Sequence, residues 1–166
     1  NWNLSHLISS NIKKDLIYPS WFEGQWTITA ENVNDSKEKP LKYDVTFYKN
    51  ESGEIIGDRS QNAESIGKAI FGERLKAVRN DPNSINNQVT FLSNNEYIES
   101  RIKERNQIFN EDLFFADEFV IQTVHKPEAS RINQVEVMSK FYRCNDIDSI
   151  TNKFSDEEIC GFQYLA

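Results

Sequence analysis

Residues Glu54–Glu73, EIIGDRSQNAESIGKAIFGE, interrupt the alternating pattern that surrounds them and decide how the chain folds. Apolar residues recur in this stretch at the three- and four-residue spacing of a helix face: Ala63, Ile66 and Ile70. Ser60 or Asn62 can cap the start, and Gly72 suits the position just beyond the end. We therefore expect one short helix over residues 62–71, packed on a sheet.

The residues before this helix have two interpretations. Gly57-Asp58-Arg59 predicts a tight exit from a strand, with Asp58 accepting from backbone amides and Arg59 covering an aromatic ring. The alternative is a binding role for Arg59. Both interpretations stay open at this stage, and we name Asp58, Arg59 and Asn62 as candidate binding residues.

The sequence on either side of this stretch predicts strands. Trp26, Ile28 and Ala30 alternate with polar residues, and Tyr43, Val45 and Phe47 do the same in the next segment. Asn94-Asn95 tolerates positive φ and therefore suits a tight hairpin. About nine or ten short strands follow one another as hairpins, which predicts an antiparallel meander. A sandwich and a closed barrel are both compatible with it, and we expect an up-and-down barrel because closure removes exposed edges.

Composition indicates one β-domain over residues 21–166, preceded by an N-terminal arm at residues 1–20. The chain has 166 residues and a net charge of −7, so we expect no nucleic-acid partner, whose phosphates attract Lys and Arg. No apolar run approaches the ~20 residues that cross a bilayer, so we expect no transmembrane segment. Because the chain starts at Asn1 without a methionine, either a targeting peptide has been removed or the chain is incomplete, and of these two we expect removal of a targeting peptide.

Motifs for catalysis or metal binding do not emerge from the sequence. The two histidines, His6 and His125, lack the further ligands that a zinc or haem site needs. No G-x-S-x-G motif, P-loop or dinucleotide fingerprint occurs. We therefore expect no enzyme, no catalytic residues and no metal. Cys144 and Cys160 are either buried free thiols or one disulfide.

A family resemblance adds to this interpretation. Gly24-Gln25-Trp26 resembles the opening signature of lipocalin-like (calycin) barrels, in which the Trp plugs one barrel end and is often packed by an Arg. Three ordered blocks also resemble an uncharacterised family of cyanobacterial and plastid proteins, whose plant members are described as thylakoid-lumen proteins. The blocks are YPSWFEGQWTIT, EIIGDRSQNAESIGKAI and VRNDPNSINNQVTF. The residues that match are Trp21, Gly24, Trp26, Asp58, Arg59, Asn62, Ser65, Asp81 and Pro82.

The resemblance covers most of residues 18–143 and implies a location in or facing the thylakoid lumen. It supplies no catalytic residues to carry over, and it adds Trp26 to the candidate binding residues. Our first hypothesis is a non-enzymatic accessory or assembly protein that docks on the lumenal side of a photosystem-type membrane complex. The alternative is a carrier that holds a small apolar ligand, a lipid or a pigment, inside the barrel. Neither hypothesis requires a resident cofactor.

Overall fold

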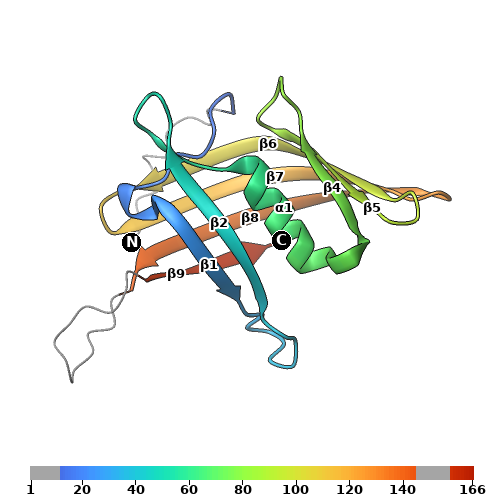
Figure 1. Ribbon diagram of the computed structural model, residues 1–166, viewed down its shortest axis with the longest axis horizontal. Coiled ribbons are helices and arrows are strands. Elements are labelled where there is room, and N and C mark those ends of the chain that lie inside the picture. Colours follow the sequence, from blue (N-terminus) through green and yellow to red (C-terminus); the bar gives the residue numbers. More distant parts are fainter. Residues whose placement is uncertain (1–11, 145–157) are drawn as a thin grey trace.

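The computed structural model describes residues 12–144 and 158–166 and consists mostly of antiparallel strands (Figure 1). Nine strands and one α-helix occur in these ranges. This confirms the prediction of a mostly-β antiparallel protein with one short helix. Residues 1–11, the first part of the predicted arm, lie outside the described residues.

Three strands form the smaller sheet, in the order β1-β2-β3. Their bounds are Gly24–Ala30, Leu41–Lys49 and Ile55–Gly57. The predicted alternation is confirmed in β1 and β2, where Trp26, Ile28, Tyr43, Val45 and Phe47 are more buried than the residues between them. β3 is short, and its ladder with β2 covers only the last part of β2, from Phe47 to Lys49.

Six strands form the larger sheet, in the order β4-β5-β6-β7-β8-β9, and every pair is antiparallel. Their bounds are Leu75–Asn80, Asn87–Leu92, Tyr97–Phe109, Leu113–His125, Ser130–Arg143 and Ile159–Leu165. The hairpin between β5 and β6 turns at Asn94 and Asn95, whose φ angles are 62° and 56°. The predicted hairpin at this Asn pair is therefore confirmed.

The hydrophobic core lies between the two sheets, where β1 and β2 cross in front of β7, β8 and β9 (Figure 1). Phe22, on the 3₁₀ turn η2 (Ser20–Phe22), lies at its centre and forms edge-on ring contacts with Phe47, Phe114 and Phe141. Its other buried members come from three strands: Val45, Phe47, Ile55, Phe114 and Ala116. These side chains couple the two sheets by apolar burial.

The helix α1 spans Arg59–Phe71 and therefore begins three residues earlier than predicted. The predicted caps were wrong, because the Asp58 carboxylate accepts from the Gln61 amide and starts the helix before Ser60. Gly72, with φ 56° and ψ −132°, follows the last helical residue as predicted. A 3₁₀ turn, η3 (Gly72–Arg74), then leads into β4.

α1 lies between the two sheets and is bonded to both of them. On one side, Ser65 Oγ accepts from the amide of Asp44 in β2. On the other side, Asn80 Nδ2 of β4 donates to Ser60 Oγ. Among the described residues no strand ladder joins β3 to β4 or β9 to β1, so the strands form two curled sheets, with α1 between β3 and β4 along the chain (Figure 1).

Cys144 and Cys160 form a disulfide, with 5.7 Å between their Cα atoms. Of the two alternatives that the sequence left open, the structure therefore has the cross-link. It joins the residue after β8 to the second residue of β9, and the Cys144 amide also donates to the Glu158 carbonyl. β9 is thus fixed to β8 both by its ladder and by a covalent bond.

Candidate functional site

A cavity of ≈ 430 Å³ lies between α1 and the inner face of the larger sheet. α1 lines one side with an apolar row that includes Ile66, Ile70 and Phe71. Strands β5, β6 and β7 line the other side with both apolar and polar residues: Gln88, Thr90, Ile98, Ser100, Ile102, Arg105, Glu118 and Gln122. The residues before β1 contribute the remaining wall: Asp15, Leu16 and Tyr18.

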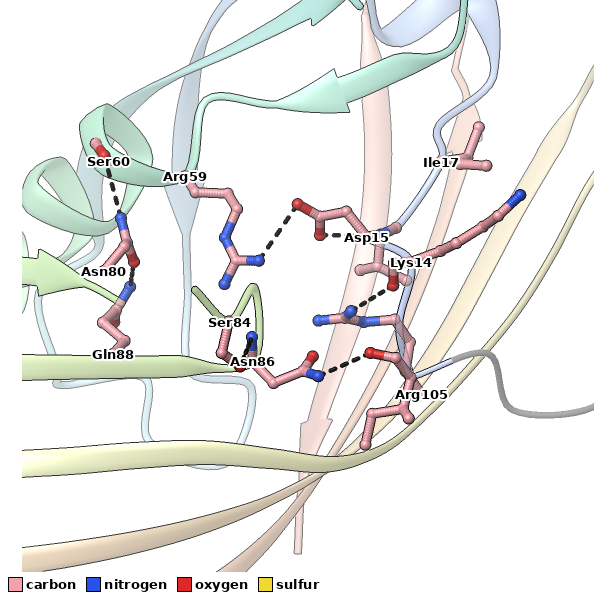
Figure 2. A network of polar contacts seen from close by, with 12 residues as sticks. Lys14, Asp15, Ile17, Arg59, Ser60, Asn80, Ser84, Asn86, Gln88 and Arg105 are labelled. Atoms are coloured by element: carbon pink, nitrogen blue, oxygen red, sulfur yellow. Dashed lines mark hydrogen bonds and ion pairs between the residues drawn. The ribbon is translucent and has the colours of Figure 1, made fainter. Parts of the chain in front are cut away.

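Two ion pairs give this cavity a charged wall. Arg105 is only 4% exposed, and its Nε donates to Glu118 Oε1 over 2.7 Å. Arg105 Nη1 also donates to the backbone carbonyl of Lys14 over 2.6 Å, as Figure 2 shows. A buried guanidinium requires such partners, because an unpaired buried charge is strongly destabilising. Arg105 therefore neutralises Glu118 and at the same time fixes the segment that precedes β1.

The second pair joins Asp15 to the first residue of α1. Arg59 Nη1 lies 3.4 Å from Asp15 Oδ2, and both side chains are partly buried (Figure 2). The other carboxylate oxygen of Asp15 accepts from the amide of Leu16 over 2.9 Å. At 3.4 Å the contact is longer than the ~2.7–2.9 Å of a strong charge-assisted hydrogen bond.

Residues 12–18 lie against the body of the protein and complete the cavity. The side-chain amide of Gln107 makes two bonds to Ile17, accepting from its nitrogen at 2.8 Å and donating to its oxygen at 2.7 Å. The Tyr18 amide donates to Ile55 O of β3, so the segment joins the edge of the smaller sheet to β6. Asn86 Nδ2 holds its start by donating to Ile12 O (Figure 2). The described part of the predicted arm is therefore bonded to the chain's own strands.

Tyr18 lies where the cavity meets the hydrophobic core, and its ring stacks on Phe114. Burial raises the pKa of the Tyr18 hydroxyl well above its ordinary value, and the nearby carboxylates of Glu118 and Asp15 raise it further. The hydroxyl is therefore neutral at physiological pH and can serve a bound molecule as a hydrogen-bond donor.

The structure brings two of the four candidate binding residues to this cavity. Arg59 and Asn62 both line it. Asp58 caps α1 instead, which agrees with the expectation that its carboxylate accepts from backbone amides. Trp26 lies elsewhere, packed against the hydrophobic core, with its indole Nε1 donating to Phe22 O over 2.7 Å. The structure pairs the guanidinium of Arg59 with Asp15, and the contact of Arg59 with an aromatic ring stays a prediction.

Arg105 and Glu118 are not among the candidate residues that we named from the sequence. An irregularity in the pairing of β6 with β7 lies between Ile102 and Glu104. Before it, Ile102 lies on the inner face with the other cavity residues, and after it the inner position passes to Arg105. An extra residue in one strand reverses the side-chain alternation beyond it, so simple alternation assigns Arg105 to the wrong face.

Other polar groups do not form a comparable site in the described part of the chain. A hollow of ≈ 620 Å³ is lined mainly by the loop of residues 81–87 and by exposed basic side chains. His125 lies outside both hollows, where Nε2 contacts Glu99 at 2.6 Å and Nδ1 contacts Ser130 Oγ at 3.1 Å. It is hydrogen-bonded at the end of its strand, as expected, and is not brought together with Arg59. The cavity beneath α1 is the better candidate because α1 and three strands line most of it.

In the described ranges, the protein is thus of a class in which antiparallel sheets and one helix border an open hollow with an apolar and a charged wall. Residues 11–160 match the family described as Domain of unknown function (DUF6816), and the chain belongs to this family. No curated protein and no solved structure matches the chain. Within the described ranges, the only α-helix is too short and too polar to span a bilayer.

Proposed function

We propose that the protein binds a small molecule with an apolar body in the cavity beneath α1. The observation that carries this proposal is the lining of the ≈ 430 Å³ cavity, in which α1 supplies apolar side chains and strands β5, β6 and β7 supply polar ones. Ligand sites typically enclose about 300–1,000 Å³ and combine apolar walls with a few well-placed polar groups. The row of Ile66, Ile70 and Phe71 is the apolar wall, and it suits a lipid or a pigment. Binding, rather than catalysis, is the activity that this arrangement supports.

A lipocalin-like closed barrel belongs to the same proposal. In it, α1 fills the opening between β3 and β4, and residues 12–18 fill part of the space between β3 and β6. The bonds from α1 to Asp44 and Asn80, and the bonds from Gln107 to Ile17, support this view. The resemblance to thylakoid-lumen proteins leads us to place the binding activity in that compartment.

A variant that fills the cavity tests the proposal. Ala63 lines the cavity, and Gln61 is an exposed residue of the same helix outside the lining. N-phenyl-1-naphthylamine, a neutral dye that fluoresces in apolar sites, serves as the probe. We expect Ala63→Phe to abolish the dye signal and Gln61→Phe to preserve it, with circular dichroism confirming that both variants are folded. Absence of dye binding by the wild-type protein contradicts the proposal.

A second candidate function is docking on the lumenal side of a photosystem-type membrane complex. The observation that favours it is a pair of exposed rings on β9, Phe162 at 63% and Tyr164 at 60% exposure. Both lie on one face of the strand, because residues two apart in a strand point the same way. Exposed apolar groups that share a face are typical of protein interaction sites.

Co-migration in native gels tests the docking function. We expect the tagged protein to travel with a membrane complex in gently solubilised thylakoids, and Phe162→Ser/Tyr164→Ser to release it. Val33→Ser is the matched control, because Val33 is 85% exposed in the loop between β1 and β2. Migration of the wild-type protein as a free monomer only would contradict docking.

A further inference from the structure

We propose that the molecule bound in the cavity carries an anionic head group, which Arg59 binds in the place that Asp15 occupies in this structure. The inference rests on the proposed binding function and adds the chemical class of the ligand, an amphipathic anion. The two arginines that line the cavity, Arg59 and Arg105, differ in how their N–H donors are bonded.

Arg105 is held by partners within the protein and is not the residue that binds the anionic head group. Its Nε and Nη1 are bonded to Glu118 and to Lys14 O, and its side chain is almost fully buried. Removing either bond would leave a buried charge without its partner, which proteins avoid. Arg105 is therefore the structural cation of the cavity, and it cancels the charge of Glu118.

Arg59 has spare donors. A guanidinium carries five N–H groups, and the polar contact of Arg59 in the described part of the chain is the one to Asp15 at 3.4 Å. Its side chain is 27% exposed and lines the cavity, so the remaining donors are accessible to a bound molecule. Carboxylates, phosphates and sulfonates present paired oxygens that match two guanidinium donors at once.

In this structure the carboxylate of Asp15 contacts Arg59 where the anionic group of the ligand would bind. Its carboxylate is held by the Leu16 amide on one oxygen and by Arg59 on the other. The contact between Asp15 and Arg59 is long and involves a single donor. A ligand whose anionic group accepts from two N–H donors of Arg59 therefore competes with Asp15 for the guanidinium. An incoming anion therefore replaces Asp15 as the partner of Arg59, so that the guanidinium stays paired, while the Asp15 carboxylate loses its cation and keeps the Leu16 amide.

The apolar wall of the cavity lies on the same helix as Arg59 and continues from it along α1. Ile66 and Ile70 follow Arg59 by seven and eleven residues, which places them near the same face of α1. At 1.5 Å per residue, Arg59 and Ile70 are separated by roughly 16 Å along the helix axis. A ligand with its head at Arg59 can thus extend a single hydrocarbon chain along Ile66 and Ile70.

Paired probes of the same chain length test the inference. Dodecanoate is the anionic probe and dodecanol the neutral one, each displacing N-phenyl-1-naphthylamine from the protein. We expect Arg59→Gln to weaken dodecanoate binding by about tenfold or more while changing dodecanol binding by less than about twofold. Asp15→Asn should strengthen dodecanoate binding, because it removes the competing charge. Arg74→Gln is the control, since Arg74 is exposed, paired with Glu96 and outside the cavity lining.

The outcomes separate the two proposals. If both probes bind and Arg59→Gln weakens neither or both equally, the anionic head group is wrong and the binding function stands. If neither probe nor the dye binds to the folded wild-type protein, both proposals fail. Selective loss of dodecanoate binding in Arg59→Gln, with Arg74→Gln unchanged, supports the inference.

Discussion

The side chain of Asn62 pairs with the backbone of Thr46 in both directions. Asn62 Oδ1 accepts from the Thr46 amide at 2.7 Å, and Asn62 Nδ2 donates to the Thr46 carbonyl at 3.0 Å. Ser65, one helical turn later, accepts from Asp44 two residues earlier in β2. Because β3 covers only Phe47–Lys49 of β2, these two side chains take the place of a neighbouring strand along the edge of β2.

Removing the side-chain amide of Asn62 should weaken the attachment of α1 to β2. We expect Asn62→Ala to lower the free energy of unfolding by about 1–3 kcal/mol, because it leaves a partly buried backbone donor without its partner. Urea unfolding followed by circular dichroism measures the loss. Asn83→Ala, in an exposed loop, is the control and should have little effect. Equal stability of the Asn62→Ala and Asn83→Ala variants would show that the pairing contributes nothing.

Arg105 should be among the most sensitive positions of the larger sheet. Arg105→Met leaves Glu118 without its cation and the Lys14 carbonyl without its donor. We expect a loss of about 3–5 kcal/mol in the free energy of unfolding, the size measured when one partner of a buried pair is removed. Lys103→Met, an exposed position on the same strand, is the control for the changed residue type.

A double variant distinguishes the ion pair from a packing defect. Arg105→Met combined with Glu118→Leu removes both charges, so less stability should be lost than in Arg105→Met alone. If the double variant is less stable than the single one by the full cost of Glu118→Leu, the two charges are not coupled. Urea denaturation of the four proteins of this cycle gives the coupling energy.

The disulfide should stabilise the attachment of β9. Cys144 and Cys160 are separated by 16 residues in the sequence, and closing a loop of that size contributes about 3 kcal/mol in the chain-entropy description. We expect Cys144→Ser/Cys160→Ser to unfold at lower urea concentration, with hydrogen exchange accelerated in Ile159–Leu165 before the other strands. Dithiothreitol should affect the wild-type protein in the same direction and leave the double variant unchanged. No difference between reduced and oxidised protein would contradict this expectation.

Much of the fold could be predicted because its determinants are local. The alternation around Trp26 and Val45, the Asn94-Asn95 turn and the glycine at position 72 each specify the backbone nearby. The start of α1 was misplaced because several residues before it can serve as caps. Only the structure shows that Asp58 does so, which leaves Asn62 available to bond β2.

The candidate site was predicted only in part, because its charged wall depends on contacts between distant segments. Asp15 and Arg59 are 44 residues apart, and Arg105 and Lys14 are 91 apart. No local pattern connects such pairs, and the irregular pairing near Ile102 further hides Arg105 from an alternation-based prediction. Arg59 and Asn62 could be named from the sequence because they lie in Glu54–Glu73, the stretch that interrupts the strand pattern.

Asp117 should make the stability of the protein depend on pH. Asp117 lies on β7, the strand between β6 and β8 in the larger sheet. Its Oδ1 is buried without a hydrogen-bond partner in the described part of the chain. Burial raises the pKa of its carboxyl above the ordinary value, and the carboxylates of Glu136, Glu104 and Glu118 raise it further. The folded chain therefore holds this proton more tightly than the unfolded chain does.

It follows that the contribution of Asp117 is favourable below its unfolded pKa of about 3.8 and is lost as pH rises through the higher folded pKa. We expect Asp117→Asn to raise the free energy of unfolding at pH 7 by up to about 1 kcal/mol, since interactions between partly exposed charges are small. The gain should disappear as the pH approaches 4. Asp112→Asn, in the exposed turn before β7, should show neither effect. A lower stability of Asp117→Asn at pH 7 would mean that the carboxylate has a favourable partner, and thermal unfolding from pH 4 to pH 8 decides between the two results.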